Sequence, residues 1–273
     1  MENFVGPTVF AQQQSSTKER FNMPYDFTNK VAVVTGASRG IGLAVARQLS
    51  AYGAKVCVNY KSSKERAEEA VRELNTAGGE AMAVQADVSD QSQAQQLIQQ
   101  AESQLGPIDF LVNNAGIFDV AAHDEFDEQM WHRTMKINVD GVFYCSWAVK
   151  DAMVARGYGR IVNIASIAGL EAKPYAIAYA TSKAAVVGFT RSLGQALAAD
   201  NVRVNAVAPG LIDTEILADC DQAWLDRLID ITPSKRIGQA DEVARMVSFL
   251  LSDESDFTVG QTLVLSGGRV NLP

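Results

Sequence analysis

The sequence VAVVTGASRGIG, residues 31–42, decides the fold. Its first five residues form a continuous run typical of a parallel strand that helices cover on both faces. Three glycines punctuate the turn, and apolar residues follow at helical spacing from Ile41 to Tyr52. Glycine lets a backbone turn sharply and approach a phosphate, and the amides that begin a helix attract anions. The stretch therefore predicts a strand, a phosphate-binding loop and a helix.

The rest of the chain repeats this alternation. Strands are expected over residues 31–35, 55–60, 80–86, 108–113, 160–165, 202–208 and 262–265, and helices over 41–52, 63–76, 91–104, 127–156, 175–199, 215–231 and 241–251. The fourth helix is expected to bend near Asn138 and Gly141. This order predicts an α/β fold, with a single Rossmann-like, doubly wound parallel sheet of about seven strands and helices on both faces. Ligands of such sheets bind at the carboxyl ends of the strands.

Composition narrows the class of protein. The 273 residues include 24 Lys and Arg against 32 Asp and Glu, a net charge of −8, which disfavours nucleic acid and anionic membranes as partners. Three scattered cysteines and two isolated histidines predict no disulfide framework and no metal site, so a cytoplasmic protein is expected. Residues 1–29 are expected to be a flexible arm, either inert or in contact with a partner, ahead of one catalytic domain at 30–273.

Further motifs follow the predicted strands. They are Asp87-Val88 after the third strand, Asn113-Asn114-Ala115-Gly116 after the fourth, Ser166 after the fifth, Tyr179 and Lys183 in a Tyr-x-x-x-Lys pattern on the next helix, and Pro209-Gly210-Leu211-Ile212-Asp213-Thr214 after the sixth. Together with the Thr-Gly-x-x-x-Gly-x-Gly loop, this set resembles the short-chain dehydrogenase/reductase family over about nine-tenths of the chain.

The resemblance implies an oxidoreductase that transfers a hydride between a nicotinamide cofactor and a carbonyl or alcohol substrate, with Asn138, Ser166, Tyr179 and Lys183 as the catalytic set. Tyr179 and Lys183 lie one turn apart on a helix, so the ammonium is expected to lower the phenol pKa, ordinarily about 10. Tyr179 would then exchange a proton with the substrate oxygen, and Ser166 would hydrogen-bond that oxygen. Asn138 would hold a water that links Lys183 to solvent.

The expected cofactor site spans the glycine loop and several strand ends. It comprises Gly36, Ser38, Arg39, Gly40, Ile41, Gly42, Tyr60, Lys61, Asp87, Val88, Asn114, Ala115, Gly116, Tyr179, Lys183, Pro209, Gly210, Ile212 and Thr214. The second strand ends in Asn59-Tyr60-Lys61, without the carboxylate that binds the ribose hydroxyls of NAD. Arg39 and Lys61 suit the 2′-phosphate of NADP, so NADP(H) is expected over NAD(H). The alternative is that both cations are solvated surface residues.

A partly apolar substrate wall is expected from Ser166, Phe118, Leu170, Tyr175, Leu217 and Trp224, with a substrate loop at about residues 211–237. The sequence is most similar to β-ketoacyl carrier-protein reductases, in which arginines beside the active-site mouth hold an acidic carrier. The matching positions here are Asp151 and Gln195, which disfavours that partner. We therefore expect reversible reduction of a free ketone or aldehyde.

Two alternatives remain. A 3-oxoacyl-[acyl-carrier-protein] reductase is the first, for which Arg156, Arg160 and Arg191 would supply the basic patch. A non-catalytic NADP-binding sensor or scaffold is the second, which loss of Tyr179 or Lys183 would have favoured. A homotetramer is also implied by the resemblance, through a smooth helical face of small residues: Ala176, Ala180, Ala184, Gly188 and Gly194.

Overall fold

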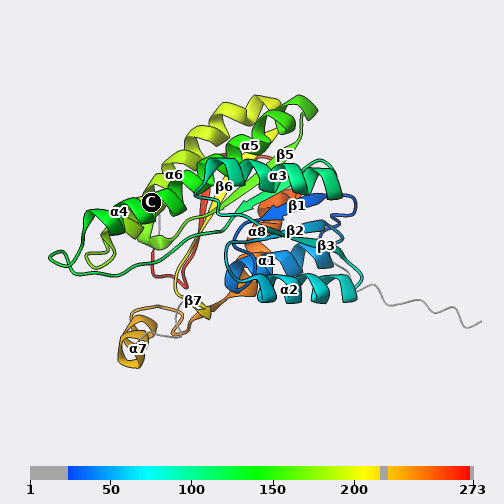
Figure 1. The fold of residues 1–273 in the computed structure, drawn as a ribbon. Helices are drawn as coiled ribbons and strands as arrows, with labels where there is room; N and C mark the ends of the chain where they lie inside the picture. Colours follow the sequence, from blue (N-terminus) through cyan, green and yellow to red (C-terminus); the bar gives the residue numbers. More distant parts are fainter. Residues whose placement is uncertain (1–23, 216–220, 271–273) are drawn as a thin grey trace, which may run out of the picture.

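A computed structural model describes residues 24–215 and 221–270. Its main sheet has seven strands in the order β3-β2-β1-β4-β5-β6-β9, and every pairing is parallel. This confirms the predicted α/β fold (Figure 1). The strands are β1 (Val31–Val34), β2 (Lys55–Tyr60), β3 (Glu80–Gln85), β4 (Phe110–Asn113), β5 (Gly159–Ile164), β6 (Val202–Pro209) and β9 (Thr262–Leu265). A separate short pair is formed by β7 (Ile212–Asp213) and β8 (Gly238–Gln239).

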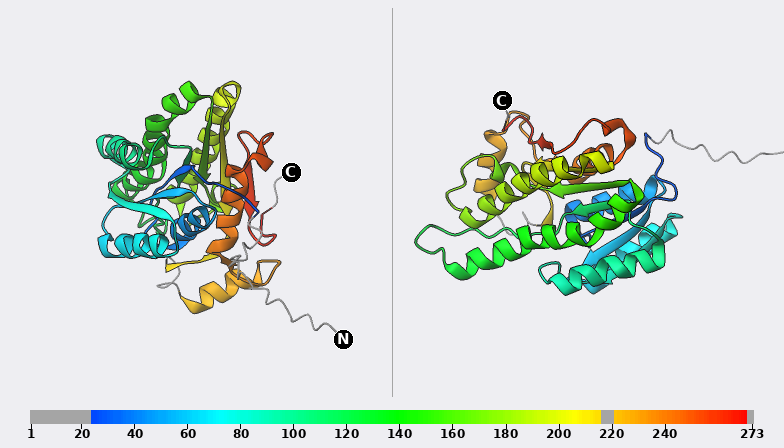
Figure 2. Two further views of the ribbon diagram at one scale, coloured as in Figure 1. Left: turned by 90° about the vertical axis from the view of Figure 1, so that its right-hand side faces the viewer. Right: turned by 90° about the horizontal axis from the view of Figure 1, so that it is seen from above.

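Helices cover both faces of the sheet, as two further views show (Figure 2). One layer holds α1 (Gly40–Ala51), α2 (Lys64–Thr76) and α8 (Ala240–Leu251). The opposite layer holds α3 (Gln91–Leu105), α4 (Glu128–Met135), α5 (Gly141–Arg156) and α6 (Ile177–Leu197), whereas α7 (Gln222–Asp230) stands apart from both layers. Because both faces are covered, every residue of β1, β4, β5 and β6 is buried.

Local chemistry fixes several helix starts. The carboxylates of Asp90, Asp127 and Asp221 accept backbone N–H groups in the first turns of α3, α4 and α7. A reciprocal capping box of Gln239 and Glu242 begins α8. Hydrogen bonds from Arg236 and from the Gln239 amide lower the pKa of Glu242 to about 2.

The predicted helices differ from the observed ones in two places. The expected helix 127–156 consists of α4, a π-helical turn at Lys136–Asp140 that contains Asn138, and α5. A π turn adds a residue to the helical repeat and re-aims the side chains within it. Within the expected helix 215–231, α7 forms Gln222–Asp230 after its Asp221 cap, and residues 216–220, which include Leu217, lie outside the described residues.

The folded body begins before Lys30. Phe27 is only 4 % exposed, and its ring lies edge-on to Phe110 of β4 at 5.0 Å. Tyr25 packs against Phe27 and Tyr52 in the same cluster. The described end of the predicted arm, residues 24–29, is therefore packed, because two aromatic side chains bury apolar surface there; residues 1–23 lie outside the described chain. No helix among residues 24–215 and 221–270 has the length and apolar character needed to span a bilayer.

Candidate active site

Close approach requires glycine at Gly36, in the loop between β1 and α1, and at Gly42, in the first turn of α1. A Cβ at Gly36 (φ +61°) would lie 2.9 Å from the Ala115 Cα, and one at Gly42 would lie 2.5 Å from the Asn114 Nδ2. Asn114 also donates from Nδ2 to the carbonyl oxygens of Thr35 (2.9 Å) and Gly36 (3.1 Å). The loop after β1 is thus locked to the segment after β4, which brings these expected cofactor residues together.

The start of α1 fits a phosphate group. Arg39 is the N-cap residue, and its exposed side chain makes no capping hydrogen bond to the first amides of α1. Thr214 reaches over the same point, since its Cγ2 is 3.4 Å from where a Cβ of Gly40 would stand. The segment after β6 therefore lies against the glycine loop, as the predicted cofactor site requires. Gly210 is fixed there by a hydrogen bond from its amide to the Leu265 carbonyl (2.9 Å).

The ends of β2 and β3 place one expected cation beside an expected acid. Lys61 Nζ lies 2.7 Å from Asp87 Oδ2. Burial alone would raise the pKa of Asp87, but hydrogen bonds from Lys61 and Ser89 hold it below its usual value. Asn59 is 2 % exposed; its Oδ1 accepts the Gly36 amide, and its Nδ2 donates to the Ala86 carbonyl. Arg39, in contrast, forms no ion pair with any described residue.

The proposed catalytic residues meet at the carboxyl end of β5. Ser166 follows this strand, and its Oγ accepts the Ala168 amide at 3.1 Å. Tyr179 and Lys183 come from α6, with Lys183 Nζ 5.7 Å from the centre of the Tyr179 ring. Lys183 is 5 % exposed and donates to the Ile164 carbonyl at 2.7 Å. The structure thus brings together three of the four residues that the sequence singled out as catalytic.

Burial dominates the electrostatics of this pair. Desolvation lowers the pKa of Lys183 from 10.5 to about 8. Desolvation raises the pKa of Tyr179, while a hydrogen bond with Ser166 acts in the opposite direction. The net shift of the Tyr179 pKa is therefore upward, opposite to the expected lowering, because burial of the phenol outweighs the hydrogen bond with Ser166.

Asn138 lies on the π turn and is completely buried. Its Oδ1 accepts the Ile117 amide (2.8 Å), and its Nδ2 donates to the Ile117 carbonyl (3.0 Å) and to Ser182 Oγ (3.0 Å). Both N–H groups are thus used, so the side chain offers no free donor to the water that the resemblance implied. Its observed contacts join the segment after β4 to α6.

The expected substrate residues are only partly gathered. Phe118 lies edge-on to Tyr179, with ring centres 4.8 Å apart, and Leu170 is half-buried just after Ser166. Tyr175 is 65 % exposed, and Trp224 on the outlying α7 is 37 % exposed. No ring contact joins either side chain to Tyr179 within the described residues, which do not include Leu217.

The remaining expected residues hold structural positions around the loop. Val88 lies against Gly141 of α5, since a Cβ on that glycine would be 3.0 Å from Val88 Cγ2. Ala115 donates its amide to Thr35 Oγ1 (3.0 Å), and Gly116 faces Asn138 and Lys183. Tyr60 and Ile212 are buried, Ser38 and Ile41 are half-buried, and Pro209 ends β6.

Sequence reasoning missed Thr35, Asn59 and Ser182. Thr35 Oγ1 accepts two backbone amides after β4, and Asn59 accepts the amide of Gly36. Ser182 connects Asn138 to α6. A signal was present in each case, because each is a polar residue placed within or beside an apolar element next to a motif.

Comparison with known proteins agrees with this geometry. The model of the short chain dehydrogenase family matches residues 30–223. The chain is 39 % identical over 240 residues to the 3-oxoacyl-[acyl-carrier-protein] reductase FabG of Staphylococcus epidermidis, covering 88 % of this chain and 98 % of the relative. It is 41 % identical over 244 residues to the 3-oxoacyl-[acyl-carrier-protein] reductase of Synechocystis, covering 89 % and 98 %.

A solved structure is also similar over nearly its whole length. It is a blue fluorescent protein from a metagenomic library in complex with NADPH, with a TM-score of 0.85, 38 % identity, and coverage of 90 % of this chain and 100 % of that one. A family match over more than half of the chain and relatives near 40 % identity lead to one conclusion: the chain belongs to the short-chain dehydrogenase family of oxidoreductases.

Proposed function

We propose that the protein is an NADP(H)-dependent oxidoreductase that reversibly reduces a ketone or aldehyde to an alcohol. The observation that carries the proposal is the buried Lys183 beside Tyr179 and Ser166, at the same sheet edge as the glycine loop. A buried ammonium without a carboxylate partner costs stability, and such groups gather at functional sites. Family membership supports an oxidoreductase of this kind.

The residues divide the chemistry between them. NADPH, when bound, supplies the hydride. Ser166 Oγ hydrogen-bonds the substrate carbonyl oxygen, and Tyr179 donates its phenolic proton to that oxygen as negative charge develops. Lys183 stabilises the phenolate that remains, and the same groups work in reverse during alcohol oxidation. The uncapped amides of α1 would hold the pyrophosphate, with Thr214 closing over them.

The charges at the end of β2 support NADP(H). Arg39 is exposed and free of ion pairs with described residues, so it can bind a 2′-phosphate without first leaving a partner. Lys61 must share its charge with Asp87 at 2.7 Å. The similar blue fluorescent protein was solved with NADPH, which supports the same choice here.

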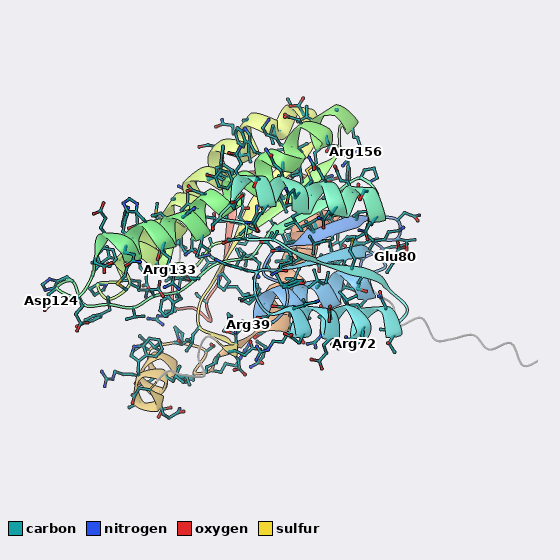
Figure 3. The ribbon with its side chains drawn as sticks, in the orientation of Figure 1. Arg39, Arg72, Glu80, Asp124, Arg133 and Arg156 are labelled. Atoms are coloured by element: carbon teal, nitrogen blue, oxygen red, sulfur yellow. The ribbon has the colours of Figure 1, made fainter. Side chains whose placement is uncertain are left out.

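The surface favours a free small molecule as substrate. Asp151 is 85 % exposed in its side chain, and Gln195 is exposed too. Arg156 donates to the Ile108 carbonyl, and Arg160 is 3 % exposed; both stand at the amino end of β5, away from the site. Figure 3 places Arg156 at the opposite end of the molecule from Asp124 in the loop after β4.

A second candidate is reduction of a 3-oxoacyl group carried on acyl carrier protein. The names of the Staphylococcus and Synechocystis relatives favour it. Of the three arginines considered for docking, Arg191 and Arg156 are exposed, but Arg156 donates to the Ile108 carbonyl, so among the described residues only the Arg191 side chain of the three has neither a hydrogen bond nor an ion pair. A carrier would therefore need a docking surface different from a cluster of these three.

A homotetramer is proposed on a narrower face than the sequence suggested. Ala184 and Gly188 of α6 are exposed, whereas a Cβ at Gly194 would lie 2.8 Å from Gly260 and from the Val204 carbonyl oxygen. Gly194 therefore serves packing against the sheet. Phe143 and Trp147 of α5 are 36 % and 45 % exposed, and their tilted rings lie 4.5 Å apart, which supplies apolar surface for subunit contact.

The test is NADPH oxidation against a panel of ketones and aldehydes, with a 3-oxoacyl thioester offered both on carrier protein and on a small thiol. Tyr179→Phe should lower kcat/KM by about 10²- to 10⁴-fold. Tyr144→Phe, on half-buried α5 surface, is the matched control and should retain activity.

The outcomes separate the candidates. A kcat/KM for the carrier-bound thioester far above that for the small thiol would favour the second candidate. Equal, high rates for wild type and Tyr179→Phe would remove Tyr179 as the proton donor. Inert wild type that still binds NADPH would point to the sensor or scaffold.

A further inference from the structure

Ser182 lies between the two proposed catalytic residues of α6 and is completely buried. Its Oγ donates to the Tyr179 carbonyl at 2.7 Å and accepts from Asn138 Nδ2 at 3.0 Å. We propose that Ser182 is a positioning residue, which ties the helix carrying Tyr179 and Lys183 to the segment that walls the substrate site. The proposal rests on the proposed function and adds a residue to the same site.

Both N–H groups of the Asn138 side chain are used in hydrogen bonds. Asn138 hydrogen-bonds both backbone groups of Ile117: its Oδ1 accepts from the amide, and its Nδ2 donates to the carbonyl. Its one remaining N–H has Ser182 as its partner. Without a hydroxyl at position 182, that N–H would be buried and unpaired, so the amide would lose the contact that fixes it to α6.

These hydrogen bonds are part of a closed ring of contacts around the Tyr179 phenol. Ile117 is followed by Phe118, whose ring lies edge-on to Tyr179 at 4.8 Å. The Tyr179 carbonyl accepts a hydrogen bond from Ser182 Oγ, and Ser182 Oγ accepts one from Asn138 Nδ2. Asn138 Nδ2 also donates to the Ile117 carbonyl. One connected set of residues therefore contacts Tyr179 both at its backbone carbonyl and at its ring.

Lys183 belongs to the same arrangement. A Cβ on Gly116 would lie 3.1 Å from Asn138 Oδ1 and 3.6 Å from Lys183 Nζ, so the amide and the ammonium face one another across this glycine. A displaced Asn138 would change the surroundings of the ammonium as well as the orientation of the phenol. Small displacements of reacting groups lower rates steeply, because proton transfer depends on alignment.

The same helix supplies a matched control. Thr190 is also completely buried on α6, and its Oγ1 accepts from Asn163 Nδ2 at 2.9 Å and donates to the Val186 carbonyl at 2.7 Å. This bonding resembles that of Ser182, but it ties α6 to β5 and does not involve Asn138 or Ile117. Loss of the Thr190 hydroxyl should therefore destabilise the fold without disturbing the ring around Tyr179.

The experiment compares Ser182→Ala with Thr190→Val in the full chain. Ser182→Ala should lower kcat about ten- to hundredfold, Ser182→Thr should restore most of it by returning a hydroxyl, and Thr190→Val should stay within about threefold of wild type. Thermal unfolding of all variants shows whether activity merely follows stability. If Ser182→Ala does not fold, Ser182→Cys keeps the shape while weakening both hydrogen bonds.

A second readout does not depend on activity. Hydrogen exchange of the Ile117 amide, protected by Asn138 Oδ1, should accelerate in the Ser182 variant and stay unchanged in Thr190→Val. Unchanged exchange in the Ser182 variant, or an equal loss of kcat in Thr190→Val, overturns the positioning role. Absence of activity in the wild type would instead overturn the proposed function and leave the exchange result to decide on Ser182.

Discussion

Buried cations lie at both ends of β5, but the groups that surround them differ. At the amino end, Arg160 and Arg203 face each other across the β5–β6 register, each 3 % exposed. Asp256 lies 2.7 Å from Arg203 and 3.7 Å from Arg160, and Asp253 lies 3.8 Å from Arg160. At the carboxyl end, Lys183 is 5 % exposed, and it donates to the backbone carbonyl of Ile164.

The difference separates structure from function. At the amino end, burial and the neighbouring Arg160 lower the pKa of Arg203, but a guanidinium stays protonated, and the carboxylates fasten β5 and β6 to the turn after α8. A buried cation without an anion loses proton affinity, which for Lys183 brings the pKa to about 8. The amino end is therefore expected to govern stability, and the carboxyl end to govern chemistry.

The largest effect should come from Lys183→Met. The variant removes the ammonium beside Tyr179, so kcat/KM should fall by about 10²- to 10⁴-fold, measured as NADPH oxidation with the best ketone of the panel. Its free energy of unfolding should be unchanged or higher, because an apolar side chain replaces an unpaired buried charge. A variant that lost activity only by unfolding would contradict the comparison.

The pH dependence of stability should report the same group. Between pH 8 and 10, Lys183 is deprotonated in the folded protein but protonated in the unfolded chain, so the free energy of unfolding should rise with pH, by about 2 kcal/mol. Above pH 10 the raised pKa of Tyr179 has the opposite sign, because the folded state then keeps a proton that the unfolded state loses. Urea unfolding of wild type and Lys183→Met checks this; an equal rise in both would contradict it.

Much of the site could be predicted because parallel strands end at one edge. The motifs after β1, β4, β5 and β6 had to converge once the alternation of elements was recognised. The spacing of Tyr179 and Lys183 on a helix placed them together without tertiary information. The upward direction of the Tyr179 pKa shift was not predicted, since charge proximity was considered and burial was not.

Side-chain partners far apart in sequence could not be predicted. The amide of Asn138 is committed to Ile117 and Ser182, which depends on how the π turn meets α6. Lys61 and Asp87 pair because β2 and β3 are neighbours, with Tyr60 opposite Gln85 in the register. The sequence singled out Arg39 and Lys61 as candidate cofactor cations, but only the packing showed that Lys61 already pairs with Asp87.

The amino end offers the next test, a stability effect without an activity effect. Asp256→Asn removes the carboxylate nearest the buried Arg203 and should lower the free energy of unfolding by about 1–2 kcal/mol, moderated because Asp256 is largely exposed. Asp253→Asn is the matched control, with a longer contact to Arg160, and should cost less than about 0.5 kcal/mol. Urea unfolding measures the free energy of unfolding of both variants. A fall in kcat of more than twofold in either variant would contradict the assignment of stability to the amino end and of chemistry to the carboxyl end.

The smallest effect extends the comparison to cations at the cofactor site. Arg39, without an ion pair among the described residues, should be the cation that reads the 2′-phosphate, so Arg39→Ala should raise KM for NADPH about tenfold and leave KM for NADH unchanged. Lys61→Ala should raise it only about twofold, because the Lys61 charge is already shared with Asp87. Initial rates with both cofactors decide the matter, with Arg72→Ala on α2 as an exposed control. A larger rise in KM for NADPH in Lys61→Ala than in Arg39→Ala would mean that the 2′-phosphate displaces Asp87 from Lys61. An ion pair in the protein without cofactor would then not show that a cation is structural.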